Sequence, residues 1–302
     1  MALPVYASPL ERIWYYTYRS ICAAIFLFLI APILIVIPLS FNVEPYFTFT
    51  KKMLALDPSG YSLRWYDTLL TFGMANPEAP RTAAWWLDFW NNAAWVRAAK
   101  NSVIIGVSST LVATVLGTVA ALGLSRPEMP YRRAIMAILI SPMIVPIIIT
   151  ATGLFFFYSA TGLAGSYVGI ILAHATLGIP FVIITVTATL VGFDKSLTRA
   201  AASLGANPTT TFFKVTMPLI LPGVISGGLF AFVTSFDEVV VVLFVAAHDQ
   251  QTIPRQMWNG IREQISPAIL AVATILTIIS IALLATVEIL RRRSERLRGI
   301  SG

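Results

Sequence analysis

The stretch LTRAAASLGANPTTTFFKVTMPLILPG, residues 197–223, separates two long apolar runs with an Ala-rich, mildly basic segment. Asp194 or Ser196 can cap a short helix over residues 197–203, because Asp and Ser side chains accept hydrogen bonds from the free amides at a helix start. Gly205 suits the left-handed conformation that often ends a helix. The stretch therefore predicts a short helix followed by a sharp turn.

A second short helix is expected directly after this turn. Asn207 is a favourable cap and Pro208 a favourable first residue, and residues 209–214 continue the helical pattern until Pro218 begins the next apolar run. The result is two short helices at an angle, lying outside the apolar runs. We expect such a segment to dock into another molecule.

The remainder of the chain is too apolar for a soluble domain. Of 302 residues, 57% are hydrophobic and 12% are charged, with a mean hydropathy of +0.79, which indicates an integral membrane protein. Because a bilayer-spanning helix needs about 20 apolar residues, we expect an all-α polytopic membrane protein with six transmembrane helices. The first run is long and lacks a small-residue cleavage site, so we expect an uncleaved helix rather than a signal peptide. The six runs are about 20–41, 102–125, 134–158, 167–191, 219–247 and 268–290.

Lys and Arg residues predict the orientation. Placing the N-terminus inside puts most of them on the cytoplasmic side, so both termini are expected in the cytoplasm. The basic tail RRRSERLR, residues 291–298, then indicates a topology anchor near anionic lipid rather than a nucleic-acid patch, although the net charge is +7. We expect one transmembrane domain over residues 1–302, with a cytoplasmic segment 1–19, a periplasmic loop 42–100, a cytoplasmic loop 192–217 and a basic cytoplasmic tail 291–302.

Small residues recur every four positions in the second run. Ser109, Ala113, Gly117 and Ala121 form a stripe that lets a second helix backbone approach closely. The stripe predicts a bundle of tightly packed helices.

The spacing inside the opening stretch resembles a known family motif. The motif begins with two Ala residues, which are followed after three intervening residues by Gly. After nine further intervening residues it has an aliphatic residue, and after one more an apolar residue followed by Pro. The corresponding residues here are Ala200, Ala201, Gly205, Val215, Met217 and Pro218. This pattern resembles the EAA loop of inner-membrane permease subunits of bacterial ABC importers. The resemblance implies the type I importer permease fold and a coupling helix that docks in a cytoplasmic ATPase. The implied coupling residues are Arg199, Ala200, Ala201, Leu204, Gly205, Ala206, Asn207, Pro208, Phe212 and Phe213, with Arg199 standing where the family has Glu.

Other stretches are similar to the spermidine/putrescine branch of these permeases. They are SFN (40–42), RWY (64–66), NS (101–102), SP (141–142), AHATLGIPFVIITV (173–186), SFDEVVVVLF (235–244) and ATILTIISIALL (273–284). This resemblance implies a polyamine or related small amine as cargo, and a location in the bacterial inner membrane. It also implies four kinds of contact: a second permease in a heterodimer, two cytoplasmic ATPase subunits, a periplasmic binding protein and lipid.

The sequence carries no catalytic motif of its own. It has no Gly-Lys pair, and therefore no phosphate-binding Walker A loop, and it lacks HExxH and CxxC. We therefore expect a transport subunit that is not an enzyme and has no cofactor, with ATP bound by the partner ATPase.

Two adjacent carboxylates in the fifth run are the strongest candidates for cargo recognition. Asp237 and Glu238 point about 100° apart on a helix, so we expect one to line a pathway and the other to pair with a neighbouring helix. Asp237 shares a helix face with Thr234 and Phe230, which suits an ammonium cargo. His174, in the fourth run, is expected either along the pathway or hydrogen-bonded between helices.

Alternatives remain open at this point. The polyamine permeases that this chain resembles tend to carry an acid in the third run, whereas Met143 and Ile147 are neutral here. An opine, an amino-acid conjugate or another zwitterion is therefore a second candidate cargo. Alternatives from other classes are an ion-gradient secondary transporter, with Asp237 or Glu238 as the ion site, and a membrane scaffold.

Overall fold

The regular structure of the chain is helical. The computed structural model describes residues 8–126, 128–194, 196–263 and 266–297. Over these ranges the only β pairing is an isolated bridge between Asn42 and Tyr61, so the all-α prediction is confirmed. The chain divides into two compact units, one made of Met1–Phe72 with Gly260–Gly302 and the other of Gly73–Asn259.

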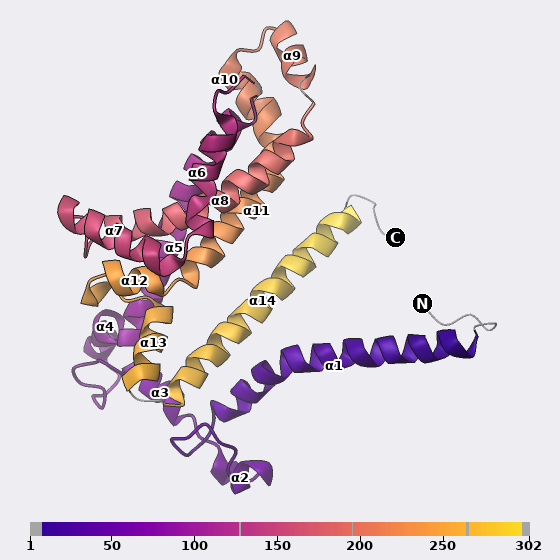
Figure 1. Ribbon diagram of the computed structural model, residues 1–302. Helices are drawn as coiled ribbons and strands as arrows, with labels where there is room; N and C mark the ends of the chain where they lie inside the picture. The colour runs from indigo at the N-terminus through magenta and orange to yellow at the C-terminus, as the bar shows by residue number, and fades with distance from the viewer. Residues whose placement is uncertain (1–7, 127, 195, 264–265, 298–302) are drawn as a thin grey trace. The chain divides into compact units, whose positions relative to one another are not determined.

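The first unit contains the two ends of the chain. Its long first helix begins with a capping box, in which the Glu11 amide donates to Ser8 Oγ and the Ser8 amide donates to Glu11 Oε2. Its helices are α1 (Pro9–Leu39), α2 (Lys51–Leu54), η1 (Pro58–Gly60), α3 (Arg64–Thr71) and α14 (Ala268–Leu297) (Figure 1). Within this unit α14 contacts both α1 and α3. The last five residues of the expected basic tail, 298–302, lie outside the described residues.

The second unit is built around α5, α8 and α11, which pack side by side along most of their lengths (Figure 1). Its elements are α4 (Ala83–Asn92), α5 (Ala94–Leu124), α6 (Arg132–Ile144), α7 (Ile147–Thr161), α8 (Tyr167–Val191), α9 (Ser196–Ser203), α10 (Pro208–Thr211), η2 (Phe212–Thr216), α11 (Met217–Phe236), α12 (Val240–Val245) and η3 (His248–Gln250), followed by the start of α13 (Ile253–Glu263).

Small residues bring these three helices into close contact. The predicted stripe on α5 is buried along its whole length, which confirms the packing role of these residues. A Cβ added at Gly117 would lie 2.6 Å from the Val182 Cβ, and one added at Gly178 would lie 2.9 Å from the Ala231 Cβ. Only glycine therefore lets α8 approach α5 and α11 this closely.

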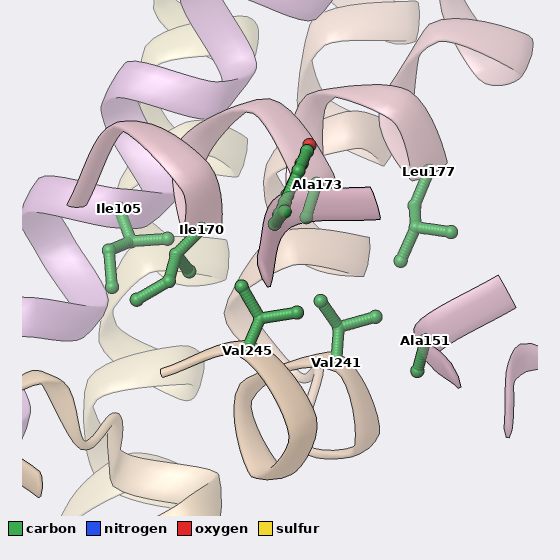
Figure 2. Packing of buried hydrophobic residues seen from close by; sticks show 8 residues of the cluster. Ile105, Ala151, Ile170, Ala173, Leu177, Val241 and Val245 are labelled. Atoms are coloured by element: carbon green, nitrogen blue, oxygen red, sulfur yellow. The ribbon is translucent and has the colours of Figure 1, made fainter. Parts of the chain in front are cut away.

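An apolar cluster lies where α12 meets α5, α7 and α8. Figure 2 shows Val241 and Val245 pointing from α12 toward Ile170, Ala173 and Leu177 of α8. Ile105 of α5 and Ala151 and Tyr158 of α7 complete the cluster, and all of these side chains are buried. The short helix α12 is thus part of the core of this unit.

Three of the six predicted spans match single helices, and a fourth is a bent pair of helices. The runs 20–41, 102–125 and 167–191 correspond to α1, α5 and α8, which are long and apolar enough to cross a membrane. The run 134–158 is instead a pair, α6 and α7, bent by 102°. The bend falls at Pro146, which has no amide to donate and forces Val145 into an extended conformation.

The fifth span differs from its prediction at both ends. Instead of starting at Pro218, the helix is continuous from Pro208 to Phe236, and it passes through the π turn η2. A π turn accommodates Pro218, whose ring would clash with a carbonyl of a regular α-helix. Instead of reaching residue 247, the helix ends at Phe236, and α12 starts separately at Val240.

Over the described residues, four helices qualify as candidate spans, and the bent pair α6–α7 makes a fifth if it is counted as one. The predicted run 268–290 lies within the single helix α14.

Candidate functional site

The exposed segment between α8 and α11, residues 192–217, begins with a capped helix. The amide and hydroxyl of Ser196 donate to the two carboxylate oxygens of Asp194, at 2.8 and 2.6 Å. The hydroxyl and then the amide hydrogen bond lower the pKa of the Asp194 carboxyl below its ordinary value. The stabilisation that this cap contributes is therefore fully present at pH values above the ordinary Asp pKa. It is lost as the pH falls through the lowered pKa of Asp194.

Gly205 ends α9 as the sequence predicts. Its φ is +83°, and its amide donates to the Ala202 carbonyl at 2.9 Å, while the Ala206 amide donates to the Ala201 carbonyl at 3.0 Å. These two bonds form a Schellman motif, with Gly205 in the left-handed position. A Cβ at Gly205 would meet nothing within 4 Å, so the backbone conformation alone calls for glycine.

The second helix of the segment is the first turn of a longer helix. Asn207 Oδ1 accepts a hydrogen bond from the Thr210 amide at 2.7 Å, which confirms the predicted cap. The prediction of a separate short helix is wrong, because α10 continues through η2 into α11. Asn207 and Pro208 therefore begin the same helix that packs against α5 and α8.

The predicted coupling residues are mostly exposed in this chain. Leu204 is 88% exposed and Phe213 is 64% exposed, so this segment presents two large apolar side chains on its surface. Phe212 packs edge-to-face on Phe213, with ring centroids 4.9 Å apart. Also exposed are Arg199, Ala200, Gly205, Asn207 and Pro208, while Ala201, Ala206 and Phe212 are half-buried.

The predicted pathway residues lie along one side of the end of α11. Phe230 is exposed, and its ring stacks on Phe181 of α8 with centroids 6.0 Å apart and an interplanar angle of 20°. Thr234 is half-buried and Asp237 is exposed. Asp237 follows the last helical residue with helix-like dihedral angles, so it keeps the predicted register with Phe230 and Thr234. Sequence reasoning did not single out Phe181, because its partner lies on another helix.

Glu238 has a different environment from Asp237, as expected, but its partner is not the expected one. Its side chain is buried, and its Oε1 accepts a hydrogen bond from the Val241 amide at 2.9 Å. The expectation of a partner on a neighbouring helix is wrong, because the chain breaks here and the carboxylate caps the start of α12 instead.

His174 lies in the middle of the bundle. Its Nδ1 is 2.8 Å from Ser235 Oγ, which also accepts a hydrogen bond from Ser109 Oγ at 2.9 Å. All three side chains are buried, so this network joins α8, α11 and α5. His174 Nε2 has no hydrogen-bond partner among the described residues. Ser235, the member of this network on α11, lies two residues before Asp237 in the sequence.

A bundle of apolar helices with an exposed, capped helical loop between two of them is the architecture of a membrane permease subunit. Residues 113–298, more than half of the chain, match the family described as binding-protein-dependent transport system inner membrane component, and the chain belongs to this family. It is therefore a permease of a binding-protein-dependent ABC importer: a multi-pass inner-membrane protein, not an enzyme, that assembles with an ATPase and a binding protein.

Similar proteins cover almost the whole chain. The chain is 29% identical to the spermidine/putrescine transport system permease protein PotC of Haemophilus influenzae, over 90% of this chain and 95% of that protein. It is 28% identical to the putrescine transport system permease protein PotI of Escherichia coli, over 91% of each. A bacterial ABC transporter that imports alginate shares the fold, with a TM-score of 0.69 and 16% identity over 94% of this chain and 99% of that one.

The family removes two of the alternatives left open by the sequence. Membership places the chain with ATP-driven importers, so the expectation of an ion-gradient secondary transporter is not retained. The membrane-scaffold alternative is set aside for the same reason.

Proposed function

We propose that this chain forms half of the translocation pathway of an importer for a polyamine or related small amine. It crosses the membrane six times, with α14 as the sixth span and with both termini in the cytoplasm. It pairs with a second, similar permease, two ATPase subunits and a periplasmic binding protein. Support for the cargo comes from relatives over at least 90% of the chain whose names specify spermidine or putrescine transport.

The observation that carries the amine proposal is the exposed carboxylate of Asp237 at the break between α11 and α12. A carboxylate within an apolar span is costly and normally faces a cavity or a partner. An ammonium group is its natural ligand, and the stacked rings of Phe230 and Phe181 offer aromatic faces for a cation–π contact. Thr234, on the same side of α11, supplies a hydroxyl between these groups.

The segment 192–217 couples this pathway to ATP hydrolysis in the partner. Leu204 and Phe213 present apolar side chains to the ATPase groove, and Arg199 contributes a positive charge on the exposed face of α9. Closure of the ATPases pulls the segment, and the continuous helix Pro208–Phe236 transmits that movement to the residues near Asp237. The pathway then opens outward to receive cargo from the binding protein.

A zwitterionic cargo is the second candidate. Met143 at the end of α6 and Ile147 at the start of α7 lie on either side of the 102° bend, and both are neutral. Neither residue can anchor a second ammonium group, so a cargo with one ammonium group and one carboxylate is an alternative. An opine or an amino-acid conjugate fits this description.

The test is uptake of labelled putrescine and spermidine into cells with and without this chain, with the rest of the transport system intact. We expect chain-dependent uptake that unlabelled amines inhibit and amino-acid conjugates do not. In Asp237→Asn the apparent KM for the amine should rise about tenfold or more, because the charge attraction is lost.

Glu44→Gln is the matched control, because it removes an exposed carboxylate from the loop 42–100 and should leave the KM unchanged. Uptake that depends on the chain but is inhibited only by conjugates would replace the amine with the zwitterion. An unchanged KM in Asp237→Asn would refute the role of Asp237.

A further inference from the structure

The short helix α12 is held at both ends by charged side chains. At its start, Glu238 Oε1 accepts a hydrogen bond from the Val241 amide at 2.9 Å. At its end, Arg255 Nη1 donates to the carbonyls of Val242 and Ala246, at 2.6 and 3.3 Å. Helix ends leave amides and carbonyls without internal partners, and these two side chains supply them.

α12 cannot obtain these partners from water on its inner side. Val241, Val242 and Val245 are buried, and Figure 2 shows Val241 and Val245 directed into the cluster with α8. A six-residue helix is also too short to be stable by itself. Its position therefore depends on packing and on the two caps.

The backbone that carries Arg255 is itself fixed to other helices. The amide of Ile253, two residues earlier, donates to Ser102 Oγ of α5 at 2.9 Å. Asn101 Nδ2 donates to the carbonyls of Asp249 and Gln251, at 2.8 and 2.9 Å, and the Tyr167 hydroxyl donates to Asn101 Oδ1 at 2.8 Å. Arg255 thus extends from an anchored segment to the last turn of α12.

We propose that Arg255 is a positioning residue that, through α12, sets the place of Glu238 and of the adjacent Asp237 in the pathway. The guanidinium bridges two carbonyls of α12 from a fixed base, so it limits how far this helix can shift. Asp237 and Glu238 lie at the other end of the same six-residue helix. The link from Arg255 to cargo selection rests on the function proposed for Asp237, whereas the link from Arg255 to the position of α12 does not.

The first experiment measures position without any cargo. In the assembled complex with Cys22→Ser, a cysteine introduced by Asp237→Cys is labelled with a water-soluble maleimide, and its rate is compared with and without Arg255→Met. We expect the labelling rate to change several-fold, because the last turn of α12 loses its donor. Arg262→Met removes an exposed Arg from the same helix α13 and should leave the rate unchanged. An unchanged rate in assembled Arg255→Met would overturn the proposal.

Arg255→Lys keeps the test valid if Arg255→Met does not assemble. Lysine retains the cation but lacks the planar, forked donor group. The labelling rate of the cysteine at position 237 in Arg255→Lys should therefore differ from that of the parent, but by less than in a variant without the cation. A rate in assembled Arg255→Lys identical to that of the parent would show that these hydrogen bonds do not position α12.

The second experiment joins position to transport. Arg255→Met should raise the apparent KM for the amine about tenfold, with the maximal rate less affected, since a hydrogen bond to a charged group is lost. In an Asp237→Asn background the same change should add little, because coupled residues are not additive. A third result is possible: Arg255→Met changes the labelling rate and also raises the KM by its full amount in the Asp237→Asn variant. That result would uphold Arg255 as the support of α12 and refute Asp237 as the cargo site.

Discussion

Gly205 shows how one residue shapes the proposed coupling segment, residues 192–217. Its positive φ completes the Schellman motif at the end of α9 and directs the chain toward Asn207, which caps the next helix. Nothing crowds the position, so a substitution there acts through the backbone dihedral angles and not through a clash. The angle between α9 and the helix Pro208–Phe236 therefore depends on this single left-handed residue.

Replacing Gly205 with Val should uncouple ATP hydrolysis from uptake. A β-branched residue resists the left-handed conformation at a cost of roughly 1–2 kcal/mol or more, so the turn should change shape. Uptake and ATPase activity, measured on the same reconstituted complexes, give the coupling ratio. Gly205→Asn is the control, because Asn tolerates this conformation and should keep most coupling. Normal coupling in well-assembled Gly205→Val complexes would contradict the importance of the turn.

At the scale of elements, the contact between α5 and α8 is where packing is least tolerant. Gly117 faces Val182 with no room for a Cβ, and the Ile179 carbonyl would lie 3.2 Å from one. The neighbouring Gly178 is equally enclosed by Ala113 and Ala231. These glycines let the backbones approach, and the hydrogen bonds of Ser109, His174 and Ser235 form at the resulting distance.

Gly117→Ala should destabilise the permease by about 1–3 kcal/mol, because the added methyl group forces α5 and α8 apart. The midpoint of thermal unfolding of the purified complex in detergent measures this change. Gly153→Ala is a suitable control, since a Cβ at Gly153 meets nothing within 4 Å and the midpoint should stay the same or rise, because Ala favours the helix. Equal midpoints for the two variants would mean that the close α5–α8 approach does not contribute to stability.

For the whole molecule, the proposed topology assigns each loop to one side of the membrane. The bias of Lys and Arg predicts that the loop 42–100 is periplasmic and that both termini are cytoplasmic. Alkaline phosphatase inserted after residue 76 should be active, because the enzyme forms its disulfides only outside the cytoplasm. The same enzyme fused after residue 302 should be inactive, whereas a fluorescent protein fused there should be bright. The reverse pattern at either position would exclude this topology.

Local signals were sufficient to predict several parts of the fold. Apolar runs predicted α1, α5 and α8, and the small-residue stripe predicted the buried face of α5. Gly205 and Asn207 predicted the turn and the cap of the coupling segment, because these structures form between residues a few positions apart. The spacing around them also indicated the family before any fold was known.

Interruptions of helices were not predictable in the same way. An apolar run has the same composition whether its helix is straight, bent by 102° at Val145 and Pro146, or ended at Phe236. Hydropathy measures the preference of a segment for lipid and carries little information on where its backbone amides find partners. The buried cap formed by Glu238 on α12 therefore became visible only in the structure.

What the sequence determined by itself is a membrane permease chain with a capped loop over residues 192–217 and a carboxylate pair in the fifth apolar run. Only the tertiary structure decided that Asp237 is exposed while Glu238 is buried, and that His174 meets Ser235. It alone also revealed Arg255 at the end of α12. The physical reason is separation along the chain: Ser109 and Ser235 are 126 residues apart, and their hydrogen bond exists only because close-packed helices bring them together.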